Sequence, residues 1–345
     1  MSRVRIHADQ GVVPDGAPHV ALLDPFWGPT PEDPRDPTAG RFRRWGEEEA
    51  SVYELVELDD ADCVVLPTAW EHYEGREAAE AAARALAERA HAAGKPLALF
   101  FVSDSTAQVP LPGAHVFRTS LNGSMRNERV HAMPALSADL GEAPPRSWRE
   151  RPVVGFCGFA PGYRNRPLAG LRRRLRGRRE HPASVRGRAC RALERSAAVD
   201  TRFVVRTEFW AGALRGGAVD YERMRQARGE FAENVRSSDY VLAARGGGNF
   251  SYRLYEAMSA GRIPLFVDTD CVLPFEDEID WRSLVPWVDA SELADLGDRV
   301  AAFHAELGPE GFRERQRECR QLWEQLLSPE GFYRSLAPRL AALPA

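Results

Sequence analysis

The sequence predicts an α/β protein built from two Rossmann-like halves. Its 345 residues exceed one ordinary domain and suit two domains of about 150 residues each. Runs that are apolar throughout alternate with helical spans, which is typical of parallel sheets covered on both faces. A polar, proline-rich segment at 141–152, GEAPPRSWRERP, separates two such series and reads as a linker. We expect domains at 1–145 and 146–290, with closing helices at 291–345.

The first half contains three predicted buried strands and one long helix. HVALLDPFWG at 19–28 reads as a short strand ended by Pro and Gly, and a Pro-rich loop without periodicity follows it. ADCVVLPT at 61–68 and LALFFVSD at 97–104 are the next two strands. The alanine-rich span 76–93 has helical spacing and ends at a Gly-Lys-Pro stop. VFRTSL and RVHAMPAL are expected to add two further strands.

The second half repeats this α/β pattern without repeating the sequence. Helices are expected at 221–235 and 251–261. The arginine-rich span 172–179 is the expected helix after the first strand, and such a charge run is typical of a solvated face. From residue 291 onward the chain reads helical, with breaks near Gly308 and Gly331. The predicted strands are PVVGFCGF, TRFVVRT, DYVLAAR and RIPLFVD, at 152–159, 201–207, 239–245 and 262–268.

Composition argues against several classes of protein. The net charge is −4, so the chain as a whole has no attraction to nucleic acid or to an anionic membrane. The five cysteines are scattered and form no CxxC or Cys/His cluster, so neither a disulfide framework nor a structural zinc is indicated. The sequence shows no signal-peptide core and no run near the roughly 18 apolar residues of a membrane span. We expect a cytoplasmic protein.

The stretch RGGGNFSYRLYEAMSAGRIPLF, Arg245–Phe266, has the clearest chemical signal. A glycine turn at a helix N-terminus brings backbone N–H groups close to an anion, and the helix dipole favours negative charge there. The spacing fits neither the dinucleotide fingerprint nor a P-loop. Arg253 and Glu256 lie three apart on one helix face, where a guanidinium can bind a diphosphate and a carboxylate a ribose. The alternative is a surface loop beside a solvated ion pair.

The region 238–281 resembles the signature region of the exostosin family of glycosyltransferases. That family reads approximately S-x-[FY]-x-L-x-P-x-G, R-x-x-E-A, G-C-I-P, L-P-F and D-W. The chain departs from it at Ala244, where the family has proline, and at Arg262, where it has cysteine. The matching positions are Ser238, Tyr240, Leu242, Gly246, Arg253, Glu256, Ala257, Gly261, Ile263, Pro264, Leu273, Pro274, Phe275, Asp280 and Trp281.

The resemblance implies a GT-B fold, in which two Rossmann-like domains face each other across a cleft. It implies a bacterial exostosin-like enzyme that moves a sugar from a nucleoside diphosphate, UDP above all, to a hydroxyl of a glycan or small-molecule acceptor. It also implies inversion at the anomeric carbon, no cofactor and no obligatory metal. No D-x-D is clearly placed at the end of a predicted strand; the DTD triplet at 268–270 is the candidate, and it lies within the family's own loop before L-P-F.

Without a metal, arginines and helix N-termini must stabilise the leaving diphosphate. Arg253 is the first candidate and Arg245 the second, whereas Arg164 and Arg166 could equally belong to a solvated loop. The predicted donor-binding residues are Arg166, Arg245, Gly246, Gly247, Gly248, Asn249, Ser251, Arg253 and Glu256.

Direct displacement needs a base for the acceptor hydroxyl, and such a base is expected at a strand's C-terminal end in the first half. Each candidate could equally be a helix cap or a loop residue. Trp27, Trp70 and Tyr73 would suit stacking on an acceptor sugar, although aromatic residues after strands are usually packing. The candidate bases are Asp104, His72, Asp24 and Glu71.

Two alternatives stay open from the sequence. One is a fucosyltransferase-like enzyme that uses a GDP-sugar, since its donor domain also combines a basic residue, a glutamate and an A-G-x-x-P turn. The other is a catalytically silent exostosin-like subunit that binds a nucleotide without turnover.

Overall fold

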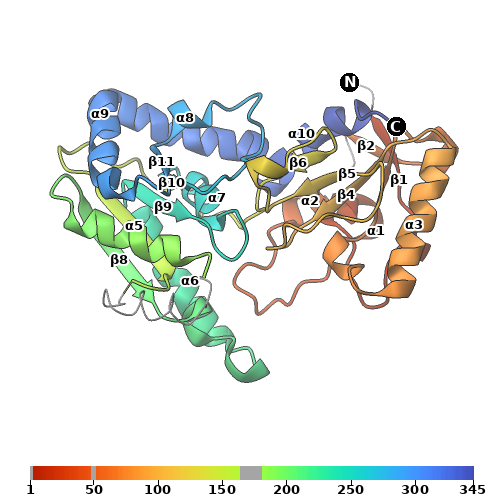
Figure 1. The fold of residues 1–345 in the computed structure, drawn as a ribbon, viewed down its shortest axis with the longest axis horizontal. Coiled ribbons are helices and arrows are strands. Elements are labelled where there is room, and N and C mark those ends of the chain that lie inside the picture. Colours follow the sequence, from red (N-terminus) through yellow and green to blue (C-terminus); the bar gives the residue numbers. More distant parts are fainter. Residues whose placement is uncertain (1–2, 48–51, 164–180) are drawn as a thin grey trace.

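The computed structural model describes residues 3–47, 52–163 and 181–345. They form two α/β units, each a sheet with helices around it (Figure 1). The sheets have the strand orders β2-β1-β3-β4-β5-β6 and β11-β10-β9-β7-β8. Every strand pair within them is parallel. The predicted class, two Rossmann-like units of the GT-B type, is confirmed.

The first sheet reverses its strand order beside β1, because β2 lies on one side of that strand and β3 to β6 follow on the other. Such a reversal places the carboxyl ends of the strands at a ligand crevice. The long helix α3 (Glu77–Ala92) lies over this sheet. The strands are β1 (Val4–His7), β2 (Tyr53–Leu55), β3 (Cys63–Val65), β4 (Leu97–Phe101), β5 (His115–Arg118) and β6 (Val130–Ala132).

The prediction of a strand at 19–28 is wrong. Its residues form a 3₁₀ turn, Ala21–Leu23, and the short helix α1 (Asp24–Trp27), followed by α2 (Arg43–Glu47). Pro25 sits in the first turn of α1, where its missing N–H costs nothing. The apolar run is buried as expected, but it packs beside the sheet instead of joining it.

The second sheet contains all four strands expected in this half and adds β11 (Trp287–Asp289). The arginine-rich span 172–179 lies outside the described residues. The other strands are β7 (Val153–Phe159), β8 (Asp200–Arg206), β9 (Tyr240–Ala244) and β10 (Ile263–Asp268), and the helices are α5 (Ser184–Arg195), α6 (Tyr221–Arg236), α7 (Tyr252–Ser259) and α8 (Trp281–Leu284).

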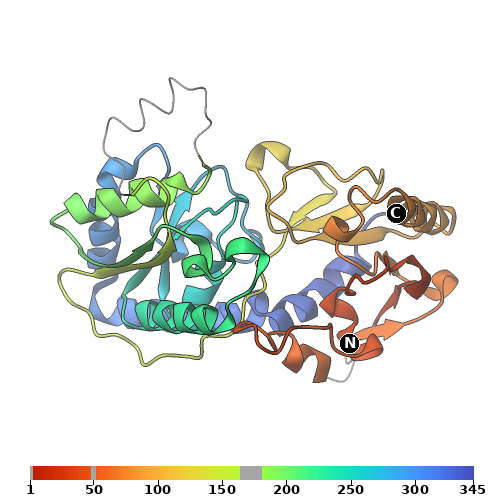
Figure 2. The same cartoon turned by 90° about the horizontal axis from the view of Figure 1, so that it is seen from below.

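The last helices connect the two units. Helix α9 (Leu296–Leu322), which breaks at Gly308 as the sequence predicts, packs on α5, α7 and β10. Helix α10 (Pro329–Ala341) crosses to the first unit and packs on β1 and α2 (Figure 2). There the Tyr53 hydroxyl donates to the Tyr333 carbonyl at 2.7 Å. Helix α10 therefore connects the second unit to the first through side-chain packing and this hydrogen bond.

Arg262, which stands where the exostosin pattern has cysteine, has a structural role. Its side chain is 2% exposed and donates to the carbonyls of Arg236, Pro144 and Gly261 at 2.9 to 3.1 Å. Burial lowers the pKa of Arg262 to about 10. Because all three carbonyls come from different segments, the guanidinium ties the linker to α6 and to the start of β10.

Among the described residues, no helix combines the length and the apolar character that a membrane span needs.

Candidate active site

The glycine turn after β9 owes its composition to close packing. None of Gly246, Gly247 and Gly248 has a positive φ, so the backbone alone does not require glycine. A Cβ at Gly247 would lie 2.3 Å from Oδ2 of Asp104, and one at Gly248 would lie 2.8 Å from the Cα of Asp104. A Cβ at Gly246 would lie 3.1 Å from Nη2 of Arg186. The turn therefore contacts the loop after β4. At Gly247 and Gly248, Asp104 occupies the space that the sequence analysis assigned to a diphosphate.

This packing predicts opposite effects for two glycine-to-alanine changes. Gly248→Ala forces a methyl group against the Asp104 backbone and the Phe250 ring, and we expect it to destabilise the protein by about 1–3 kcal/mol. Gly229→Ala in the middle of α6 meets no atom within 4 Å, so we expect a gain of about 0.5–1 kcal/mol. Thermal and urea unfolding of both variants measure the difference. A Gly248→Ala protein as stable as the parent would contradict the close approach.

A cavity of about 710 Å³ opens beside the turn, a size typical of small-molecule sites. It lies between the two units, at the carboxyl ends of β4, β7 and β9, where ligands bind in α/β proteins. The first unit contributes Asp36, Thr38, Arg41 and Asp104 to its wall, and the second contributes the remaining residues.

Arg253 lies in the first turn of α7 and lines this cavity. Its Nη2 and Nε donate to the Cys157 carbonyl of β7 at 3.0 and 3.3 Å, and its guanidinium lies 4.8 Å from the centre of the Phe156 ring. Burial lowers the pKa of Arg253. Gly158, at φ 141°, makes room for it, because a Cβ there would lie 2.2 Å from Nη2.

Glu256, one turn further along α7, forms an ion pair with Arg228 of α6. Both side chains are nearly buried, at 10% and 12% exposure, and both line the cavity. The pairing holds the carboxylate in one orientation within the wall. The sequence analysis missed Arg228 because its partner lies on another helix, and no local spacing indicates the pair.

Arg186 is a further residue that the sequence analysis missed. It lies in the first turn of α5, is 7% exposed and lines the cavity. Its guanidinium donates to the carbonyls of Ala244 and Phe159, the last residues of β9 and β7, at 3.1 and 3.4 Å. Burial lowers the pKa of Arg186, and the charge of Arg253 lowers it further. Within the described ranges neither arginine has a carboxylate within ion-pair distance. The charges of Glu256 and Asp104 act on Arg253 and Arg186, respectively, from farther away.

Of the four candidate bases, the structure places only Asp104 on the cavity wall. Glu71 accepts the N–H of Val102 at 3.1 Å, and burial raises its pKa. Asp24 is 3% exposed and accepts the Thr30 hydroxyl at 2.6 Å and its N–H at 3.1 Å, so it braces the loop after α1. His72 ends a 3₁₀ turn away from the cavity lining.

The predicted acceptor aromatics do not gather at the cavity. Trp70 and Tyr73 are buried in the core beneath α3 and stack on each other with ring centres 5.9 Å apart. Neither offers a face to a sugar in this structure. Trp27 is half-buried and packs against the edge of His19, 5.6 Å between centres.

The remaining donor candidates differ in position. Asn249 is fully buried between the units, where its amide donates to Asn122 at 2.6 Å and its N–H to Ser120 at 2.9 Å. Arg245 donates to the Gly247 carbonyl at 3.0 Å. Ser251 begins α7, and its buried hydroxyl has no partner among the described residues. Arg166 and Arg164 lie outside the described residues.

The carboxylates of the DTD triplet accept donors from the protein itself. Asp268 accepts the Cys271 N–H at 3.0 Å and the Trp287 indole N–H at 3.2 Å. Asp270, at φ 63°, accepts the Ser124 hydroxyl at 3.1 Å across the interface between the units. Both aspartates therefore brace the loop that precedes L-P-F.

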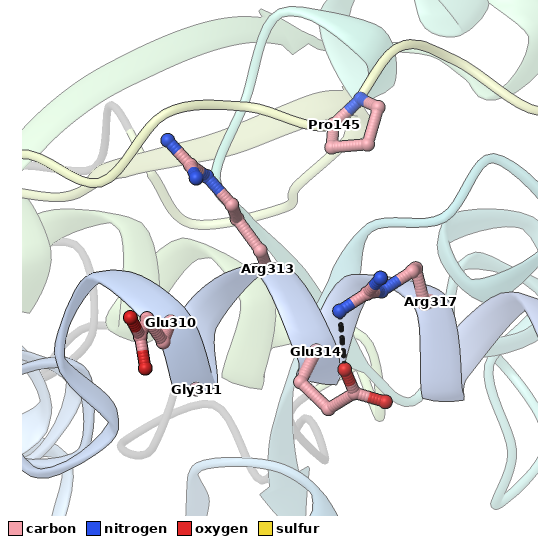
Figure 3. Close-up of a pocket in the computed structure, with 6 residues that line it drawn as sticks. All are labelled: Pro145, Glu310, Gly311, Arg313, Glu314 and Arg317. Carbon is pink, nitrogen blue, oxygen red and sulfur yellow. Dashed lines mark hydrogen bonds and ion pairs between the residues drawn. The ribbon is translucent and has the colours of Figure 1, made fainter.

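A second hollow of about 540 Å³ lies between the linker at Pro145 and one face of α9 (Figure 3). Its charged side chains extend from the helix at separate positions, and Glu314 pairs with Arg317 across one turn. It shares no residue with the glycine turn or with the arginine cluster. We therefore place the candidate active site in the cavity between the units.

Comparison with known proteins finds a family match in the second unit. Residues 188–303 match the family model of the Exostosin GT47 domain. This part of the chain is similar to an exostosin domain. The match spans the glycine turn, α7 and Arg228, so the resemblance expected from the sequence is confirmed there. Arg186 and the entire first unit lie outside it.

Two animal proteins are similar to part of this chain. The chain is 32% identical over 112 residues to Exostosin-1 of Drosophila melanogaster, and 26% identical over 109 residues to Exostosin-1a of Danio rerio. Each match covers 32% of this chain and 14% of the relative's length. The crystal structure of a glycosyltransferase from Rickettsia africae ESF-5 aligns with 99% of this chain and 100% of its own, at 9% identity and a TM-score of 0.37. A likeness that low does not support a common fold.

Proposed function

We propose that the chain is an exostosin-like glycosyltransferase that moves a sugar from a UDP-sugar to a hydroxyl acceptor with inversion and without an obligatory metal. One observation carries the proposal. The cavity between the units combines two arginines that are held by backbone carbonyls, Arg186 and Arg253, with the carboxylate of Asp104 from the opposite unit.

Arg186 and Arg253 are proposed to bind the diphosphate. Both guanidinium groups are already held by backbone carbonyls at the ends of β7 and β9, so little reorganisation is needed when an anion enters. The N-terminus of α7 would add backbone N–H groups, and Ser251, its N-cap, remains a predicted member of the donor site. Together these groups would stabilise the negative charge that develops on the leaving UDP.

Glu256 is proposed to accept the ribose hydroxyls. Its pairing with Arg228 keeps the carboxylate oriented. Arg166 and Arg245 remain predicted members of the donor site.

Asp104 is proposed as the base. The acceptor oxygen attacks the anomeric carbon as the bond to the diphosphate oxygen breaks, and the hydroxyl proton passes to the Asp104 carboxylate. A single displacement of this kind inverts the anomeric carbon. Asp104 is exposed and lines the cavity beside the glycine turn, which is the location that such a step requires.

Nucleotide binding and donor turnover test the proposal. We expect isothermal titration calorimetry in the presence of EDTA to show UDP binding about tenfold or more tighter than GDP binding, and UDP release from a UDP-sugar in an assay of the isolated chain. Tighter GDP binding would favour the fucosyltransferase-like alternative. UDP binding without hydrolysis or transfer from any UDP-sugar would favour the catalytically silent subunit. No binding of either nucleotide would overturn the proposal.

A further inference from the structure

The large hydrophobic side chains that are exposed gather around one place. In the described parts of the chain they are Val102, Val204, Phe209, Leu214, Val219 and Tyr252. Four of these line the cavity, and a fifth, Val102, lies two residues before Asp104. We call Phe209, Leu214 and Val219 the apolar rim; they are 63%, 45% and 44% exposed. Exposed apolar groups concentrated at one cavity mark an interaction site.

The loop between β8 and α6 holds the apolar rim in place. Trp210 and Ala211 have φ values of 48° and 56°, a left-handed conformation that is unfavourable for residues other than glycine. Hydrogen bonds within the loop accompany this conformation: the Ala213 N–H donates to the Trp210 carbonyl at 3.0 Å, and the Asp220 N–H donates to the Ala213 carbonyl at 2.9 Å. The first turn of the loop, Phe209–Gly212, packs on α6 and on β7. The exposure of Phe209 is therefore a property of an ordered loop.

The cavity thus presents two chemistries. Its interior carries the arginines Arg186 and Arg253, whereas the side chains of the apolar rim have no hydrogen-bond donor or acceptor. Such side chains cannot pair with the hydroxyls of a glycan or with the polar edge of a nucleobase. They stabilise a bound molecule only by removing its apolar surface from water.

We propose that the acceptor carries an apolar aglycone, an aromatic ring or an alkyl chain, beside the hydroxyl that receives the sugar. The proposal rests on the proposed glycosyl transfer. The hydroxyl end lies in the cavity near Asp104 and the aglycone lies on the apolar rim, because the rim residues line the same cavity as Asp104. A glycan has little apolar surface to bury on Leu214 and Val219, so it would gain less from the rim than an apolar aglycone does.

Glycosides that differ only in the aglycone test the inference. With saturating UDP present, we measure binding of methyl, octyl and 4-nitrophenyl β-glucosides by calorimetry. We expect the octyl and 4-nitrophenyl glucosides to bind about tenfold or more tighter than the methyl glucoside. In a Phe209→Ser/Leu214→Ser double variant the advantage should shrink to about threefold or less. Comparison of the octyl with the 4-nitrophenyl compound separates an alkyl from an aromatic aglycone.

Val204→Ser supplies the matched control, since Val204 is 38% exposed on β8 and does not line the cavity. It should leave the preference for apolar aglycones intact. Equal binding of all three glucosides by the parent protein, or an unchanged preference in the double variant, overturns the inference. Weaker UDP binding in the double variant also overturns it, because the rim would then hold the nucleobase. Failure of the parent to bind UDP at all is the separate result that rejects the proposed function.

Discussion

Replacing Arg253 with alanine is expected to weaken UDP binding about 100-fold. A charge-assisted hydrogen bond contributes about 1.5–3 kcal/mol, and an arginine bound to a diphosphate makes two such bonds. Neighbouring Arg186 already spans two backbone carbonyls and cannot move to replace the lost guanidinium. Isothermal titration calorimetry with UDP measures the loss directly.

Loss of fold must be separated from loss of binding, because Arg253 also holds the Cys157 carbonyl and packs on Phe156. Arg253→Lys keeps a cation at this position, and we expect it to bind UDP with an affinity between those of the parent and the alanine variant. Arg225→Ala, on the exposed surface of α6, is the matched control and should leave UDP affinity unchanged. If Arg253→Ala binds UDP as the parent does, the donor site has been assigned wrongly.

Asp104→Asn is expected to lower the rate of sugar transfer about 10²- to 10⁴-fold, the usual contribution of a general base. The amide has the size of the carboxylate, so the contact with Gly247 and Gly248 survives. UDP affinity should therefore stay within about twofold of the parent value. Steady-state transfer kinetics and UDP calorimetry on the same preparation separate the two effects.

Glu71→Gln provides the comparison, since Glu71 is the candidate base whose pKa burial raises. Its carboxylate accepts the Val102 N–H and does not line the cavity, and a glutamine can keep that hydrogen bond. We expect a small change in transfer rate. If Glu71→Gln lost most of its transfer rate while Asp104→Asn kept its own, Glu71 and not Asp104 would be the base.

The second sheet could be predicted almost completely from the sequence. Its strands β7, β9 and β10 are largely apolar runs that are followed by a glycine or a polar turn, so local periodicity is sufficient for them. The same signal was misleading at 19–28, because an apolar run shows that a segment is buried and not which partner buries it. The N-terminal strand β1 was missed because VRIH is short and half polar.

Several matching positions of the exostosin pattern stabilise the structure, and their spacing alone does not show this. Trp281 donates its indole N–H to the Pro274 carbonyl at 2.8 Å, and Asp280 caps α8 by accepting the Ser283 N–H. Phe275, at φ 55°, lies between these two anchors. A sequence signature thus mixes residues that hold a loop with residues that line a cavity, and only their positions in the fold separate them.

By itself the sequence determined the α/β class, the linker and the local unit of strand, glycine turn and helix that carries Arg253 and Glu256. Each of these depends on interactions within about thirty residues, where spacing and side-chain type are sufficient. The tertiary structure alone decided that Arg186 and Arg228 join that unit, that Asp104 lies against the glycines, and that Trp70 and Tyr73 do not reach the cavity. These relations join side chains from different helices, strands and loops, and they depend on how those elements pack together.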